Sequence, residues 1–113
     1  MSRPHYYFSI ADFAAAHGDD PELAFAGRSP DALATALRLA LRTPVLFERW
    51  RARQDEPDRV DPQLAAVDAQ AEVDARQADL EVDLEVITDL PMPVLRQRLN
   101  LLIGAHWQLR DVR

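Results

Sequence analysis

The chain has 113 residues, 48% of them hydrophobic and 28% charged, and a formal net charge of −6 at pH 7. This length and balance predict one globular domain and exclude a disordered or fibrous chain. The absence of cysteine excludes disulfides, thiolate metal sites and cysteine nucleophiles. No apolar run is long enough to span a membrane and no secretory leader is recognisable, so we expect a cytoplasmic protein without a membrane segment.

The first quarter of the chain predicts two short strands on either side of a turn. Apolar and aromatic residues alternate over residues 6–10, which is typical of a strand. Residues 12–17 are compatible with one helical turn, which Gly18 ends. Residues 23–27 then predict a second brief strand.

Two successive helix starts are the clearest local signals. Ser29 offers a capping hydroxyl and is followed by Pro30 at the first helical position. Leucines recur every four residues behind this start, so the segment to residue 42 predicts a helix with one apolar face, formed by Leu33, Leu37 and Leu41. Thr43-Pro44 repeats the start signal and predicts a second helix to about Gln54, because proline inside one long helix would cost about 3 kcal/mol.

The middle of the chain is less decided. Residues 55–62 are rich in proline and acids and predict a charged loop. Residues 63–71 fit either a helix, by composition, or a strand, by alternation. From about Val73 onward the alternation favours a strand, and its phase changes at residues 76–78, as a turn or a bulge would require.

An eight-residue alternation of acids and aliphatics is the strongest pattern in the sequence. Side chains of a strand point alternately to its two faces. The aliphatic residues would therefore share a buried face, made of Leu80, Val82, Leu84 and Val86. The acids would form a row on the solvent face, made of Asp79, Glu81, Asp83 and Glu85.

The last part of the chain predicts a helix and a final strand. Apolar residues recur at helical spacing over residues 93–103, with Arg96 and Arg98 outside the apolar stripe. Residues 106–112 can supply the strand, which would complete a C-terminal strand–helix–strand unit.

These elements predict a single α+β domain over residues 1–113. We expect a small, mainly antiparallel sheet of about four strands, with helices over residues 30–54 and 93–103 packed on one face. An all-helical segment over residues 30–79 is the alternative.

Negative charge is concentrated in one third of the chain. Residues 55–90 carry a net charge of −10, whereas residues 1–54 carry +1 and residues 91–113 carry +3. A surface of one sign steers association with the opposite sign, so the acidic row is a candidate contact for a basic protein partner. The alternatives are solvation, protection of a sheet edge, metal binding or catalysis, and mimicry of nucleic acid.

A second candidate is the basic segment near the end of the second predicted helix. Arg49 and Arg53 lie one helical turn apart, and with Arg42 they could bind a phosphate or a carboxylate. Cations at the end of a helix also complement its dipole, which is the simpler interpretation. A single basic cluster in an acidic chain argues against nucleic acid as the partner.

Motifs for catalysis, metals and cofactors are absent from the sequence. The three histidines lack metal-ligand spacing, the serines lie outside a nucleophile elbow, and the three glycines are too scattered for a phosphate loop. We therefore expect a protein that is not an enzyme and that holds no cofactor or metal. The exclusive use of arginine for basic residues fits a GC-rich bacterial genome and leaves no lysine for Schiff-base chemistry.

The expected function is that of a small acidic interaction protein. Size, acidity and the lack of catalytic motifs resemble those of small acidic immunity proteins, antitoxins and secretion chaperones, which cover a basic surface of a partner. A homodimer is one expected assembly. The alternative is a small ligand-binding domain or enzyme with a pocket near His106, Trp107 and Tyr6.

Overall fold

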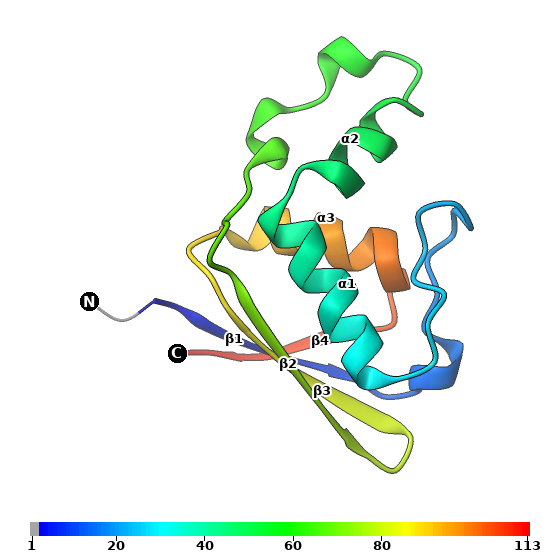
Figure 1. Cartoon of the computed structure of the whole chain (residues 1–113), viewed down its shortest axis with the longest axis vertical. Coiled ribbons are helices and arrows are strands. Elements are labelled where there is room, and N and C mark those ends of the chain that lie inside the picture. The colour runs from blue at the N-terminus through cyan, green and yellow to red at the C-terminus, as the bar shows by residue number, and fades with distance from the viewer. Residues whose placement is uncertain (1–2) are drawn as a thin grey trace.

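The computed structural model describes residues 3–113, in which one four-stranded sheet carries three α-helices on a single face (Figure 1). The elements in chain order are β1 (His5–Ile10), α1 (Pro30–Arg42), α2 (Val45–Arg51), β2 (Glu72–Ala78), β3 (Glu81–Ile87), α3 (Met92–Ile103) and β4 (Gln108–Val112). The α+β class, the four strands and the placement of the helices are therefore confirmed. None of the helices in this part of the chain is long and apolar enough to cross a membrane.

The strands lie in the order β2-β3-β1-β4, and every neighbouring pair is antiparallel. Strands β3 and β4 run parallel to each other but are separated by β1. The predicted C-terminal strand–helix–strand unit is therefore a split unit, in which another strand lies between its two strands. With α1 and α2 taken together, the element order is the β-α-β-β-α-β of ferredoxin-like folds. Folds of this kind host many unrelated functions, so the topology by itself assigns none.

Local signals explain where the first two helices begin. The Ser29 hydroxyl accepts a hydrogen bond from the Ala32 N–H at 3.1 Å, and Pro30 is the first helical residue. The expected apolar face of α1 is buried against the sheet through Leu33, Leu37 and Leu41. Helix α2 begins after Pro44, as predicted, but ends at Arg51 rather than near Gln54.

The core lies between the helices and one face of the sheet. Alternate residues of the central strands supply the sheet side, namely Phe8, Ile10, Val82, Leu84 and Val86. Because the side chains of a strand alternate, the residues between them point to the opposite face, which no helix of residues 3–113 covers. That uncovered face is where the predicted acidic row lies.

The buried Arg98 of α3 contradicts its predicted position outside the apolar stripe. Its side chain is 0% exposed and lies over the Phe47 ring, with 5.2 Å between the guanidinium carbon and the ring centre. Its Nε donates to the Ala40 carbonyl at 3.3 Å, and its Nη2 donates to the carbonyls of Leu64 and Ala66 at 2.7 and 3.2 Å. Burial lowers the pKa of Arg98 to about 10, so the guanidinium remains charged at neutral pH.

Two segments before β2 differ from the predicted strands. Residues 23–27 form turn and coil instead of a strand, because the Phe25 N–H donates to the Leu102 carbonyl at the end of α3. The undecided region around residues 63–71 begins with a short 3-10 helix, Pro62–Ala65, and continues as coil. The strand expected from about residue 73 is confirmed as β2, and the charged loop at 55–62 contains another 3-10 turn, Pro57–Arg59.

The β2–β3 hairpin turns one step later than the sequence pattern predicts. The two residues Asp79 and Leu80 form the turn, with Asp79 at a φ of 58°, a left-handed conformation that aspartate tolerates better than most residues. The prediction that Leu80 shares the buried face is therefore wrong, and its side chain is 70% exposed. The Leu80 carbonyl accepts from the Phe13 N–H at 3.1 Å, which ties the turn to the body of the domain.

Asp68 joins three distant segments through one carboxylate. Oδ2 accepts from the Thr88 hydroxyl at 2.8 Å, from the Asp89 N–H at 3.4 Å and from the Arg3 guanidinium, while Oδ1 accepts from the Gln70 N–H at 2.9 Å. Partial burial opposes ionisation, but the Thr88 bond, the two N–H donors and Arg3 together hold the pKa of Asp68 below its ordinary value. The carboxylate thus connects the loop before β2 to the N-terminal segment and to the turn before α3.

Candidate functional site

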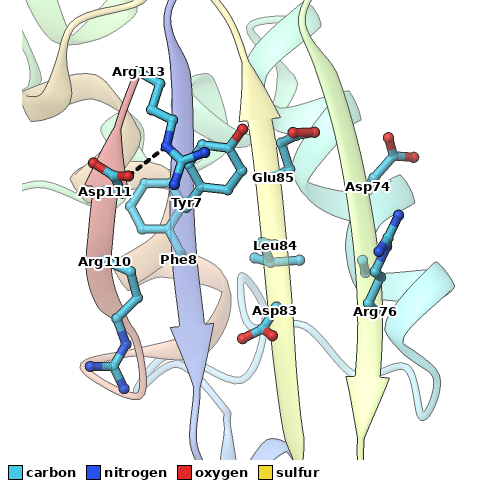
Figure 2. A pocket seen from close by; sticks show the side chains of 11 residues that line it. Tyr7, Phe8, Asp74, Arg76, Asp83, Leu84, Glu85, Arg110, Asp111 and Arg113 are labelled. Carbon is cyan, nitrogen blue, oxygen red and sulfur yellow. Dashed lines mark hydrogen bonds and ion pairs between the residues drawn. The ribbon is translucent and has the colours of Figure 1, made fainter.

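The uncovered sheet face carries three of the four predicted acidic residues, of which Figure 2 shows Asp83 and Glu85. Glu81, Asp83 and Glu85 alternate along β3 with the buried Val82 and Leu84, as expected for one face of a strand. Asp79 does not belong to this row, because it lies in the hairpin turn. Strand β3 lies between β2 and β1, so the row crosses the middle of the sheet and does not protect an edge.

A second row runs across the strands through Glu85. The register pairs Tyr7 with both Asp111 and Glu85, and it pairs Glu85 with Asp74, so these four side chains cross the face from β4 to β2. Asp74 and Glu85 are like charges directly opposite each other, an arrangement that destabilises a sheet. We call Asp111, Tyr7, Glu85 and Asp74 the cross-strand row.

Arginines lie on either side of the cross-strand row. The next row of the sheet pairs Arg76 with Asp83 on the β2 side, and on the β4 side Arg110 Nε donates to the Ser9 hydroxyl at 2.8 Å. Arg113 lies at the other side, where its Nε donates to Asp111 Oδ2 at 2.7 Å. The face is therefore acidic along its centre and is bordered by cations.

The Asp111 end of the cross-strand row already holds a cation. The Arg113 guanidinium carbon lies 5.3 Å from the centre of the Tyr7 ring, which is within the range of a cation–π contact. The hydrogen bond from Arg113 lowers the pKa of Asp111. Partial burial and the neighbouring Glu85 carboxylate raise the pKa of Tyr7, so its hydroxyl is protonated at neutral pH. In this way Tyr7 and a carboxylate bind a guanidinium from the chain itself.

The Asp74 end of the row forms no salt bridge within residues 3–113. Within residues 3–113, no arginine or histidine nitrogen lies within the 4.0 Å of a salt bridge from Asp74 or Asp83, and the only such neighbour of Glu85 is His5, at 3.6 Å. The facing carboxylates of Asp74 and Glu85 thus make no salt bridge to an arginine within residues 3–113, although Arg76 lies two positions from Asp74 on the same face (Figure 2).

The face forms a shallow hollow of about 740 Å³ between the arginines of β4 and those of β2. Carboxylates, one tyrosine and arginine stems line it, and no cluster of three histidine, aspartate or glutamate side chains that could hold a metal occurs in residues 3–113. Such a lining can bind and orient charged side chains through ion pairs and cation–π contacts.

The predicted anion-binding arginines serve different segments of the fold. Arg42 Nε donates to the Ala71 carbonyl at 2.6 Å. Arg49 donates to the Glu22 carbonyl at 2.6 Å, and Arg53 pairs with the carboxylates of Asp20 and Glu22 at 2.6 and 2.5 Å. These contacts pin the loop at residues 20–22 onto α2. The anion-binding hypothesis stays a prediction.

The predicted pocket near the C-terminal histidine is only partly assembled. His106 and Trp107 line a hollow of about 190 Å³, but Tyr6 is not part of its lining. The Tyr6 hydroxyl instead donates to the Leu90 carbonyl at 3.1 Å, and the Trp107 indole N–H donates to Asn100 Oδ1 at 2.9 Å. The hollow is smaller than the roughly 300–1,000 Å³ of most ligand pockets.

Four residues of the site come from outside the predicted acidic strand. Tyr7 and Asp74 could have been found from alternation alone, because each lies between residues that the pattern assigns to the core. Asp111 and Arg113 could not, because their place beside Tyr7 depends on a strand register and a bulge that involve residues a hundred positions apart.

Fold and site together define a ferredoxin-like α+β domain with an uncovered, charge-bearing sheet face. Comparison of the chain with protein-family models, with curated protein sequences and with solved structures gave no match.

Proposed function

We propose that this protein is a non-catalytic interaction domain that binds an arginine-rich or lysine-rich segment of a partner protein on its uncovered sheet face. The observation that carries the proposal is the pair formed by Asp74 and Glu85, two facing carboxylates on an open surface that make no salt bridge to an arginine within residues 3–113. A sheet bearing this pair is less stable than one without it. A bound cation would turn the repulsion into attraction for both carboxylates.

The Arg113 contact supports a basic side chain as the ligand. Arg113 lies over Tyr7 and bonds Asp111, so the face binds a guanidinium with an aromatic ring and a carboxylate. A partner's arginine at the other end of the row would meet the same ring edge and two carboxylates. The row, with Asp83 and Glu81 beside it, then provides contacts for more than one basic residue.

A protein partner agrees with the charges better than nucleic acid does. Sheet faces that bind RNA stack bases on several aromatic rings and attract phosphates with cations. Here the hollow is lined by two aromatic residues, of which Phe8 belongs to the core, so Tyr7 alone presents its ring among the carboxylates of the lining. The immunity, antitoxin or chaperone role, the cytoplasmic location and the bacterial source expected from composition belong to this proposal.

Neutralising Asp74 and Glu85 together should weaken binding of a short poly-arginine peptide about tenfold, which corresponds to about 1.4 kcal/mol. The double variant Asp74→Asn/Glu85→Gln removes two charges and changes little volume. Isothermal titration calorimetry at low and at high salt measures the effect, and the variant's binding should also depend less on salt.

The matched control is Asp55→Asn/Glu56→Gln, which removes two charges from the loop at 55–62. Its affinity for the peptide should stay within about twofold of wild type, because this loop follows α2 on the helix side of the domain, away from the strands (Figure 1). Equal losses in the two double variants would mean that the peptide senses net charge only, and would overturn the proposed site.

The single change Asp74→Asn should stabilise the fold slightly, by about 0.2–1 kcal/mol at low salt, because it removes the like-charge cross-strand pair. Urea denaturation measures the gain, which added salt should reduce. A loss of stability would show that Asp74 has a structural role, and would remove the argument that its charge is kept for binding.

A further inference from the structure

The two edges of the sheet are treated differently. Strand β2 forms one edge, where arginines of α1 bind main-chain carbonyl groups: Arg38 donates to Val73 of β2 and Arg42 donates to Ala71 just before it, both at 2.6 Å. Strand β4 forms the other edge, and all its residues are exposed. Within residues 3–113, a single hydrogen bond engages its outer side, from the Val112 N–H to Oδ1 of Asp111 at 2.9 Å.

A bulge in β4 determines which main-chain groups point outward. Tyr7 pairs with Asp111 while Phe8 pairs with Leu109, so Arg110 is an extra residue. His5 and Arg113 exchange both of their main-chain hydrogen bonds, and such pairs alternate along an antiparallel ladder with pairs whose groups point away. By this alternation the main-chain N–H and carbonyl groups of Val112 and Leu109 point away from β1, toward the open edge. The bulge places these two residues three positions apart, whereas a regular strand would place them two apart.

The side chains of these two outward residues share one face of the sheet. Leu109 lies opposite Phe8 and Val112 lies opposite Tyr6, which both face the helices. Leu109 is 40% exposed and Val112 is 49% exposed, so the edge presents two apolar side chains to solvent. Arg110 and Asp111 lie between them and line the opposite, uncovered face.

We propose that β4 pairs antiparallel with β4 of a second copy of this chain, about a two-fold axis that passes between Arg110 and Asp111. In this register the outward residue Leu109 faces Val112 of the other copy, and Arg110 faces Asp111 of the other copy. Both pairings occur twice by symmetry. The result joins two four-stranded sheets into one continuous sheet.

The irregular spacing of β4 favours a second copy over an unrelated strand. A regular strand offers outward groups every two residues, which cannot match a spacing of three. Another β4 has the same bulge and therefore the same spacing. Apolar residues then meet apolar residues, and each arginine meets an aspartate, so the edge is complementary to itself in both respects.

The Asp111 carboxylate competes with this pairing in the free chain. It bonds the Val112 N–H and Arg113, and in the dimer a carbonyl of the other copy would take the Val112 N–H while Arg110 of that copy approaches the carboxylate. Because the pairing involves one short strand from each copy, we expect a dimer that forms only at high protein concentration.

The test uses two charge variants, alone and mixed. Arg110→Asp places two aspartates opposite each other across the axis, and Asp111→Arg places two arginines there. Sedimentation velocity should show wild type approaching twice the chain mass of 12.8 kDa as concentration rises, and each variant alone remaining at the monomer mass. An equimolar mixture of the variants should recover the dimer, because every aspartate then faces an arginine.

Two further variants separate edge pairing from general stickiness. Val112→Pro removes the outward N–H without touching a β1 hydrogen bond and should abolish the dimer. Leu39→Lys removes a leucine that is 56% exposed on α1 and should leave the dimer unchanged. A monomeric wild type at the highest concentration reached, or a mixture that stays monomeric, would overturn the proposal. No basic partner enters these measurements, so their failure leaves the proposed partner binding standing.

Discussion

Replacing Arg98 with alanine is expected to lower the free energy of unfolding by about 3–5 kcal/mol. The guanidinium is the donor for carbonyls of Ala40, Leu64 and Ala66, which would lose a hydrogen-bond partner in the interior. Removal of the side chain would also leave a cavity beside Phe47. Urea denaturation monitored by tryptophan fluorescence measures the change.

Arg98→Met separates the cavity from the unpaired carbonyls. Methionine fills much of the volume but donates no hydrogen bond, so it should recover part of the stability and remain about 2 kcal/mol below wild type. Native stability is commonly about 5–15 kcal/mol, so this milder variant stays measurable if the alanine variant does not fold. A methionine variant as stable as wild type would show that the buried charge contributes no net stability, as is known for some buried ion pairs.

Arg98 also illustrates why part of the fold could not be predicted from sequence. The helical spacing of the leucines on α3 predicts an apolar stripe with Arg98 outside it. Its burial depends on the loop at residues 64–66, which lies against the helix and offers carbonyl groups at bonding distance. No periodicity within α3 contains information about that loop.

The sequence correctly predicts the elements that interactions between neighbouring residues determine. The cap at Ser29 and the proline after it are sufficient to begin α1, and the acid–aliphatic alternation identifies β3 and its two faces. The sequence pattern predicts the wrong position for the hairpin turn, because the turn has Asp79 in a left-handed conformation and not the glycine or asparagine that usually marks such turns. The alternation of acids and aliphatics also includes the two turn residues, so it gives no sign that the strand begins after them.

The candidate site was predictable only along one strand. Glu81, Asp83 and Glu85 follow from the alternation, but the pairing of Glu85 with Asp74 and with Tyr7 follows from register. Register is determined by turns and by the buried face of each strand, so it becomes known only when the sheet is assembled. The facing carboxylates of Asp74 and Glu85, on which the proposed function depends, can therefore be recognised only in the assembled sheet.

Replacing Asp68 with asparagine is expected to lower the free energy of unfolding by about 2 kcal/mol at neutral pH. The Thr88 hydroxyl, the Gln70 N–H and Arg3 all donate to the carboxylate. Asparagine keeps the shape but offers one accepting oxygen, and its amide group would face donors. Urea denaturation over a range of pH measures the difference between variant and wild type.

The pH dependence of that difference identifies the charge as its cause. The pKa of Asp68 lies below its ordinary value of 3.8 in the folded protein, so the unfolded chain takes up the proton first as pH falls. The contribution of Asp68 is therefore complete above about pH 4 and is lost as the pH falls through the folded-state pKa. Wild type and Asp68→Asn should accordingly converge in stability at acid pH.

The control variant is Asp61→Asn, which keeps a carbonyl acceptor for the single N–H of Gln63 and should show no such difference in stability from wild type. A gap between wild type and Asp68→Asn that persists unchanged in acid would mean that geometry, and not ionisation, makes Asp68 the junction of the three segments.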